Sequence, residues 1–235
     1  MFNRAVVGLF VILVAVALGI SGCLNTASYH TAQPVEEGAT EAAVALEATT
    51  STGDDALEGT VVTQPRLNVR RGLSEELDLG FTAGTFGFAA DLNYQIWRDD
   101  NLAVSLSPYQ GVAWARGFGE DYDDIDAESQ LRLTTLLGVH GNVELSDAAV
   151  LTAGMKPGFF YQSHQGFGLT GLSESDTQFN PLIGVSLGLR AELDRLWLFP
   201  EFNLVYAGID EDDQLIPIIG GDEGVMMTFG VGVGF

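Results

Sequence analysis

The sequence predicts an all-β protein, a closed antiparallel β-barrel of about ten strands, with eight strands as the alternative. Three observations lead to this prediction. Apolar and polar residues alternate in repeated segments, short connections alternate with long ones, and the last segment has one apolar face. Successive residues of a strand point to opposite sides of a sheet, so each alternating segment has one apolar and one polar side. Ten such segments in 235 residues favour a sheet that closes on itself.

The last segment, 225–235, shows the alternation most plainly. Its apolar face consists of Val225, Met227, Phe229, Val231, Val233 and Phe235, and glycines at 230, 232 and 234 leave the other face almost bare. A final strand of this kind, closing on an aromatic residue, resembles the last strand of small bacterial outer-membrane β-barrels of the OmpA and OmpX type. The resemblance implies an assembly signal read by the barrel-insertion machinery, formed by Phe229, Val231, Val233 and Phe235.

Nine further segments complete the predicted sheet. They are 40–49, 61–70, 77–83, 88–96, 102–115, 131–145, 151–161, 179–193 and 198–206. The first is the weakest, because Ala and Glu favour helix over strand. An apparent slip near Gln110 indicates a β-bulge within the fifth segment.

The lengths of the connections predict the orientation of the barrel. Short connections at 72–76, 98–101, 146–148 and 194–195 alternate with long ones at 51–60, 116–128, 165–177 and 208–223, and only the tight turn at 84–87 departs from this order. Outer-membrane barrels have short periplasmic turns and longer extracellular loops. An even number of strands then places both the N- and C-termini of the barrel in the periplasm. The hairpin at 69–80 also resembles this family.

The polar faces of the strands carry charges of both signs, which predicts a polar lumen and an apolar, lipid-facing exterior. A network of ion pairs is expected there, because an unpaired charge in a low-dielectric interior costs several kcal/mol. A ten-stranded barrel filled in this way is closer to a plugged barrel than to a pore. The predicted network consists of Arg66, Arg70, Asp78, Asp91, Arg132, Glu144, Lys156, Arg190, Glu192 and Glu201. A narrow selective channel is one alternative, and a soluble, lipocalin-like periplasmic binding lipoprotein with the faces reversed is another.

The N-terminus has the pattern of an export signal. Arg4 precedes an uncharged apolar run from Ala5 to Ile20, which is shorter than the ~20 residues that a membrane-spanning helix needs. Leu18 to Cys23 resembles the bacterial lipoprotein box, which implies cleavage before Cys23 and attachment of diacylglycerol and an acyl chain such as palmitate. The predicted parts are therefore a signal peptide at 1–22, a lipidated flexible tether at 23–38 and the barrel at 39–235. Leu24, in place of aspartate, favours the outer membrane.

Composition limits the functions to consider. A net charge of -22 argues against nucleic-acid binding, which needs clustered Lys and Arg. The expected partners are outer-membrane lipid, lipopolysaccharide and the insertion and lipoprotein-sorting machineries, and the expected state is a monomer. No catalytic motif accompanies the three histidines, so a non-enzymatic surface or envelope-structural role without a cofactor is expected. A barrel enzyme acting on lipid or peptide is the alternative.

Carboxylates gather in two of the long loops, where oxygen ligands suit Ca²⁺. The candidates are Asp121, Asp123, Asp124, Asp126 and Glu128. Their spacing departs from the EF-hand pattern, because Ile125 and Asp126 replace an oxygen ligand and the turn glycine. A solvated acidic loop is therefore the main interpretation, with weak divalent-ion binding as the alternative.

We predict that Cys23→Ala abolishes incorporation of radioactive palmitate into the protein in growing cells. The lone cysteine is the only side chain to which the lipoprotein pathway attaches lipid. Undiminished label in the variant would contradict the prediction.

Overall fold

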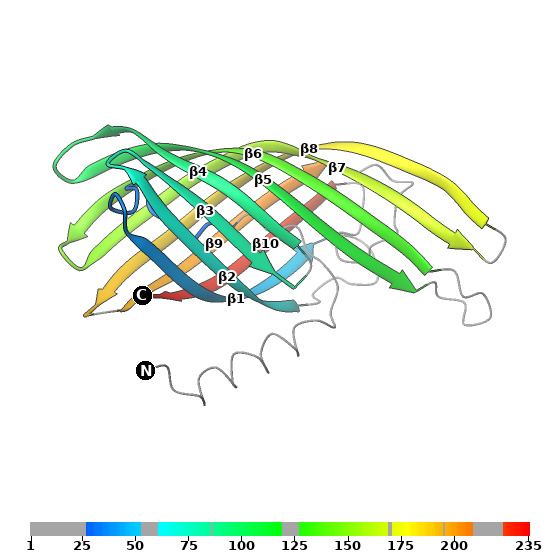
Figure 1. Ribbon diagram of the computed structural model, residues 1–235, viewed down its shortest axis with the longest axis horizontal. Helices are drawn as coiled ribbons and strands as arrows, with labels where there is room; N and C mark the ends of the chain where they lie inside the picture. The colour runs from blue at the N-terminus through cyan, green and yellow to red at the C-terminus, as the bar shows by residue number, and fades with distance from the viewer. Residues whose placement is uncertain are drawn as a thin grey trace, which may run out of the picture.

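The computed structural model describes residues 27–52, 61–85, 87–118, 127–168, 171–194, 196–208 and 223–235. They form one closed antiparallel barrel in which each strand pairs with its sequence neighbours and β1 pairs with β10 (Figure 1). The strands are β1 (Thr40–Thr52), β2 (Val61–Ser74), β3 (Leu77–Gly84), β4 (Gly87–Arg98), β5 (Leu102–Phe118), β6 (Ala127–Ser146), β7 (Ala149–Gly168), β8 (Gly171–Leu193), β9 (Leu196–Gly208) and β10 (Glu223–Gly234). The prediction of ten strands is confirmed. Within the described residues, no helix has the length and apolar character to cross a bilayer.

The weakest predicted strand is essential to closure. β1 bonds β2 on one side and β10 on the other, with Glu47 opposite Gly230 and Leu46 opposite Val231. Phe235 follows β10 and exchanges backbone hydrogen bonds with Ala42. Helix propensity is overridden here because a barrel leaves no unpaired strand edge only when its first and last strands meet.

The two ends of the barrel differ, and we call them the turn end and the loop end. Connections at 75–76, 99–101, 147–148 and 194–195 form the turn end, where Phe235 also lies. The loop end has the connections at 53–60, 85–86, 119–126, 169–170 and 209–222. Figure 1 shows β7 and β8 reaching far beyond β1 to β4 at the loop end.

The predicted long connection at 165–177 is wrong. β7 continues to Gly168 and β8 begins at Gly171, so most of that segment is a paired hairpin. These two strands contain 20 and 23 residues, whereas about 9–11 residues cross a membrane. The sequence does not reveal this hairpin, because its residues are mostly polar and show little apolar alternation. Two strands can pair through their backbones without having an apolar face.

The exterior of the barrel is apolar and its interior is largely polar, as predicted for a membrane barrel. Leu46 is 62% exposed and Phe229 is 53% exposed on the outer face, whereas inward-facing Glu47 and Asn93 are fully buried. This arrangement contradicts the soluble, lipocalin-like alternative, whose apolar face would point inward. All four residues of the predicted assembly signal, Phe229, Val231, Val233 and Phe235, alternate with the inward-facing glycines of β10.

The predicted bulge near Gln110 is absent. β5 stays in register with β6 through this region, and the register with β4 shifts at Gln95 and Trp97 instead. Gln110 is an outward-facing polar residue, and its amide oxygen accepts a 2.8 Å hydrogen bond from the Thr135 hydroxyl. A polar side chain interrupts the apolar alternation here without a bulge, because its partner on the next strand satisfies it.

Val231→Arg should destabilise the folded barrel by about 2–4 kcal/mol, because Val231 faces lipid away from the ends of its strand. Phe235→Arg places the same charge at the turn end and should cost little. Urea unfolding in lipid vesicles measures both. Equal stability of the two variants would show that depth in the membrane does not govern this face.

Candidate functional site

The segment 27–38 runs inside the lumen, and we call it the plug. Its contacts approach the turn end in chain order. The backbone N–H groups of Ser28 and Tyr29 donate to the Glu201 carboxylate at mid-strand, at 3.2 and 2.8 Å. The N–H of Val35 donates to Asp78 at 3.0 Å, near the start of β3. Glu37 then forms a bridge with Gly72, close to the end of β2.

The sequence-based prediction of a flexible tether at 23–38 is therefore wrong for its described part. Ala27, Tyr29, Ala32 and Val35 are all buried. Small and polar residues suit a solvated tether, but the same residues also fit a narrow polar lumen. The hydrogen-bond partners on the barrel wall, which the sequence of this segment does not show, decide between a solvated tether and a segment packed in the lumen.

Two further hydrogen bonds connect the plug to side chains of the barrel wall. The Asn93 amide donates to the backbone carbonyl of Thr31 at 3.2 Å, and the Gln33 amide donates to Glu144. Non-helical backbone is tolerated at membrane depth only when the protein itself satisfies its polar groups. The lumen side chains of β3, β4 and β9 perform that task here.

The predicted charge network divides into separate clusters along the lumen. In the first, the Arg70 guanidinium donates to Asp78 and to Asp91, with Nε 2.9 Å from Asp78 and Nη2 2.7 Å from Asp91. All three side chains are buried. Charge-assisted bonds of this kind offset the desolvation of the ions, and removal of one partner would leave an uncompensated buried charge.

A second cluster lies nearer the middle of the barrel. The Lys156 ammonium contacts Glu201 at 3.4 Å and donates to the hydroxyl of Ser28 at 3.1 Å. Arg66 Nε lies 2.6 Å from the Glu47 carboxylate on the neighbouring strand. Glu201 therefore bonds a wall cation and the plug backbone together, so the ion pair also positions the plug.

The remaining predicted network residues lie at the turn-end rim or pack differently. Arg190 forms two 3.1 Å bonds to Glu41 and one 2.6 Å bond to Glu192, which is exposed. Glu144 is half-buried and lies 3.9 Å from Arg98. Arg132 stacks over the ring of Phe160 at 4.8 Å.

Part of the lumen is apolar, which the prediction of a polar lumen missed. One inward-facing cluster beyond the plug consists of Leu136, Phe160, Leu182, Val205, Ala207 and Met226. On the lumen face, Leu136 and Leu182 each lie between a polar residue and a glycine, and their outward-facing neighbours are also largely apolar, so period 2 alone does not identify them as lumen residues. The charged network and the polar side chains occupy the turn-end half, together with a second apolar cluster around Tyr29.

The bare glycine row of β10 is a socket for the plug. Ala27 and Tyr29 pack in one buried cluster with Ala43, Ala45, Trp197 and Phe199. A Cβ on Gly230 would overlap the Tyr29 hydroxyl, and one on Gly232 would lie 3.2 Å from the Tyr29 ring. The glycine row was visible in the sequence, and it was the available signal that something must fill this side of the lumen.

Two histidines meet at the boundary between plug and wall. The rings of His30 and His140 lie 4.7 Å apart, and His30 Nε2 is 4.0 Å from Asp91. Nδ1 of His30 lies 2.9 Å from the Thr31 carbonyl oxygen. A carbonyl oxygen only accepts, so Nδ1 donates, and in the neutral ring Nε2 is left as an acceptor. Both rings are buried away from solvent.

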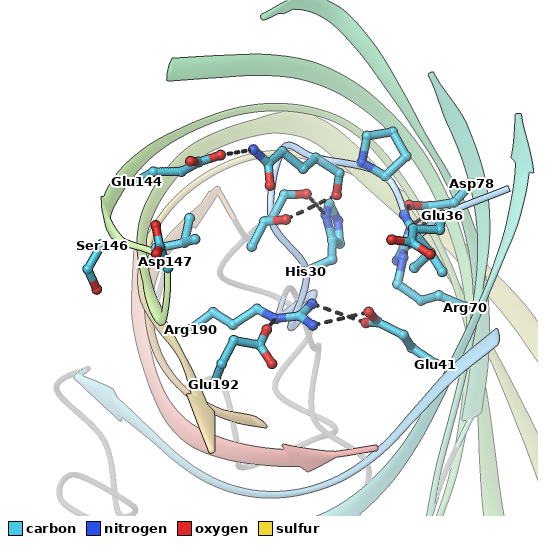
Figure 2. Close-up of a pocket in the computed structure, with 15 residues that line it drawn as sticks. His30, Glu36, Glu41, Arg70, Asp78, Glu144, Ser146, Asp147, Arg190 and Glu192 are labelled. Atoms are coloured by element: carbon cyan, nitrogen blue, oxygen red, sulfur yellow. Dashed lines mark hydrogen bonds and ion pairs between the residues drawn. The ribbon is translucent and has the colours of Figure 1, made fainter. Parts of the chain in front are cut away.

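A polar cavity of about 270 Å³ lies between the plug and the wall at the turn end. Figure 2 shows His30 near its centre, Glu144 and Asp147 on one side, and Arg70 and Asp78 on the other. Arg190 and Glu192 border the lower side of the view, with Glu41 opposite Arg190. Charged residues thus surround the opening, most of them already paired within the protein.

Several predicted site residues lie outside the described residues. These are Cys23, Asp121, Asp123, Asp124 and Asp126, and only the backbone of Glu128 is described. In the described ranges, no group of three or more His, Cys, Asp or Glu side chains is arranged to hold a metal ion.

Gly230→Ala should destabilise the protein by about 1–3 kcal/mol, because the added methyl overpacks the socket of Tyr29. Gly232→Ala is the matched control and should cost less, since its methyl meets only a 3.2 Å contact. Combining Gly230→Ala with Tyr29→Phe, which removes the overlapping hydroxyl, should recover part of the loss. Urea midpoints in vesicles measure all three, and a Gly230→Ala protein as stable as the parent would place the plug elsewhere.

Comparisons with known proteins relate the chain to outer-membrane barrels through its fold. No family model matches it, and no curated protein sequence matches it significantly. The outer membrane protease OmpT from Escherichia coli has a TM-score of 0.54 at 10% identity, with 83% of this chain and 96% of that chain covered. The translocator domain of autotransporter NalP from Neisseria meningitidis has a TM-score of 0.49 at 13% identity, covering 99% and 95%.

The attachment invasion locus protein Ail of Yersinia pestis is a further neighbour. It has a TM-score of 0.38 at 10% identity, with 85% of this chain and 99% of that chain covered. Identities this low say nothing about activity. Together with the closed ten-stranded sheet and its apolar exterior, the match to OmpT shows that the chain has the fold of bacterial outer-membrane β-barrels.

Proposed function

We propose that the protein is an outer-membrane lipoprotein whose closed barrel has a surface or envelope-structural role. The observation that carries this proposal is the plug in the turn-end half of the lumen. Its backbone bonds Glu201 and Asp78, and its Tyr29 ring occupies the glycine row of β10. A lumen occupied by its own chain does not serve as an open pore.

The proposed orientation places the turn end in the periplasm and the loop end outside the cell. Connection lengths support this choice, since outer-membrane barrels have their short turns on the periplasmic side. The barrel termini are then periplasmic, and a lipid on Cys23 adds an anchor. Lipopolysaccharide would surround the loop end, and the terminal strand would be recognised by the insertion machinery.

A non-catalytic role is part of the proposal. His140 is buried between plug and wall, and His30, although it lines the turn-end cavity, is only 4% exposed. The nearest carboxylate to His30, that of Asp91, already accepts a bond from Arg70. This arrangement supports a structural use of the histidines.

The full-length protein should show little or no ion conductance in planar bilayers. A variant with Tyr29→Gly, His30→Gly and Val35→Gly loosens the plug, because it removes the side chains that fill the lumen, and should open measurable current steps. A variant with outward-facing Leu46→Ala is the control for general loss of packing. Current steps in the parent as large as those in the loosened variant would refute a closed barrel.

A further inference from the structure

The two histidines at the boundary between plug and wall are titratable groups that a closed barrel does not need. His30 belongs to the plug, and His140 belongs to β6 of the wall. Their ring centroids lie 4.7 Å apart, and the two residues are 4% and 2% exposed. Histidine is the side chain whose charge ordinarily changes between pH 5 and 8. The contact between plug and wall therefore contains two groups that can titrate in the physiological range.

Buried ions surround this histidine pair. They come from β2, β3, β4, β7 and β9, and they are Arg70, Asp78, Asp91, Lys156 and Glu201. His30 Nε2 lies 4.0 Å from Asp91 Oδ1, and the same oxygen already accepts a 2.7 Å hydrogen bond from Arg70. Nε2 itself has no hydrogen-bond partner among the described residues, so it is the atom at which the His30 ring can take up a proton.

Only one of the two rings can carry a charge while the plug is in place. A proton on His30 would face Asp91, which compensates part of the cost of a buried charge. A second proton, on His140, would place two like charges 4.7 Å apart, away from the bulk water that would screen them. His140 has little room to turn away, because an added Cβ on Gly138 or Gly154 would come within 2.5 or 2.7 Å of its ring nitrogens.

Release of the plug would separate the two rings. His30 would leave with the plug, and His140 would face a hydrated lumen, so each ring could take up a proton near the ordinary histidine pKa of about 6.5. The released state therefore binds at least one more proton than the held state. By linkage, the plug is held most firmly above about pH 6.5 and more weakly as the pH falls below that value.

The other ionisable groups near the plug keep their charge in this range. Glu201 and Asp78 are paired with Lys156 and Arg70, and carboxylates in water take up protons only near pH 4. The phenols of Tyr29, on the plug, and of Tyr109, opposite Asp91 on β5, are neutral at and below pH 7.5. Between pH 7.5 and 5, the histidine pair is thus the part of this contact whose protonation differs between the held and released states.

We propose that His30 and His140 form a proton-sensitive latch, which holds the plug at neutral pH and loosens it when the turn-end side becomes acidic. His30 borders the turn-end cavity, so the pair responds to the pH at that end of the barrel. Under the proposed orientation this is the periplasm. The latch goes beyond the closed-barrel role, because it makes the closure conditional on pH.

A buried thiol on the plug measures its release. Thr31, which is 5% exposed, is replaced by Cys in the refolded, full-length Cys23→Ala protein in lipid vesicles, and its reaction rate with a maleimide is divided by that of a Ser146→Cys protein at the same pH. Ser146 is exposed, so the ratio removes the pH dependence of the thiol itself. The ratio should rise at least roughly 30-fold from pH 7.5 to pH 5, as one additional proton on the released state requires.

Histidine variants assign the change to the pair. His140→Gln removes a proton from the released state only and should reduce the rise by roughly 30-fold. The double variant His30→Gln and His140→Gln should show no rise. Gln33→Ala is the matched control, because it removes the bond from the plug to Glu144 but leaves both rings. It should increase labelling at both pH values and keep the pH response.

A ratio in the parent that stays constant or falls between pH 7.5 and 5 overturns the latch, and a fall would mean that the His30 and Asp91 pair tightens the plug. A full rise in His140→Gln also overturns it, as does any rise in the double variant. Conductance at pH 7.5 tests the closed barrel separately. A parent that conducts at pH 7.5 refutes the closed barrel, whereas a thiol that stays protected at pH 5 refutes the latch alone.

Discussion

The hydrogen bonds from plug backbone to wall carboxylates are the interaction on which the interior depends. A segment without helix or strand pairing exposes N–H and C=O groups, and a membrane barrel offers them no bulk water. Glu201 accepts from Ser28 and Tyr29, and Asp78 accepts from Val35. Each carboxylate is also paired with a wall cation, Lys156 or Arg70. The same ions therefore neutralise the wall and hold the plug.

Shape complements charge in this interior. The glycine row of β10 makes room for Tyr29, and Gly72 lies where a Cβ would overlap the backbone of Glu36 as the plug leaves the lumen. Glycine at these positions is explained by close approach of another part of the chain. Because β10 also forms the closing seam with β1, the plug packs against the seam that completes the barrel.

The lumen is uneven around its circumference and along its length. Charged groups of β3, β6, β7 and β9 and the Asn93 amide of β4 bond the plug, and apolar side chains fill the part of the lumen beyond it. Such unevenness is expected where one chain segment occupies only part of a cylindrical space.

Strand alternation determined most of the fold from the sequence alone. Period 2 identified the ten strands, the charges on their polar faces indicated which side faces lipid, and connection lengths distinguished the two ends, because all three are local properties of the chain. The charged lumen residues were also identifiable, since opposite charges on a buried face must pair. The lipoprotein prediction at Cys23 stays a prediction, because that residue lies outside the described part of the chain.

Only the tertiary structure decided what the segment 27–38 does and which charges pair. No periodic pattern in the sequence relates Tyr29 to Gly230, which is about 200 residues away. The same holds for His30 and His140, which are about 110 residues apart. The hairpin at 165–177 depended likewise on backbone pairing rather than on side-chain pattern. Contacts of this kind are set by the curvature and closure of the barrel, which bring distant strands to one interior, and no local sequence signal encodes that proximity.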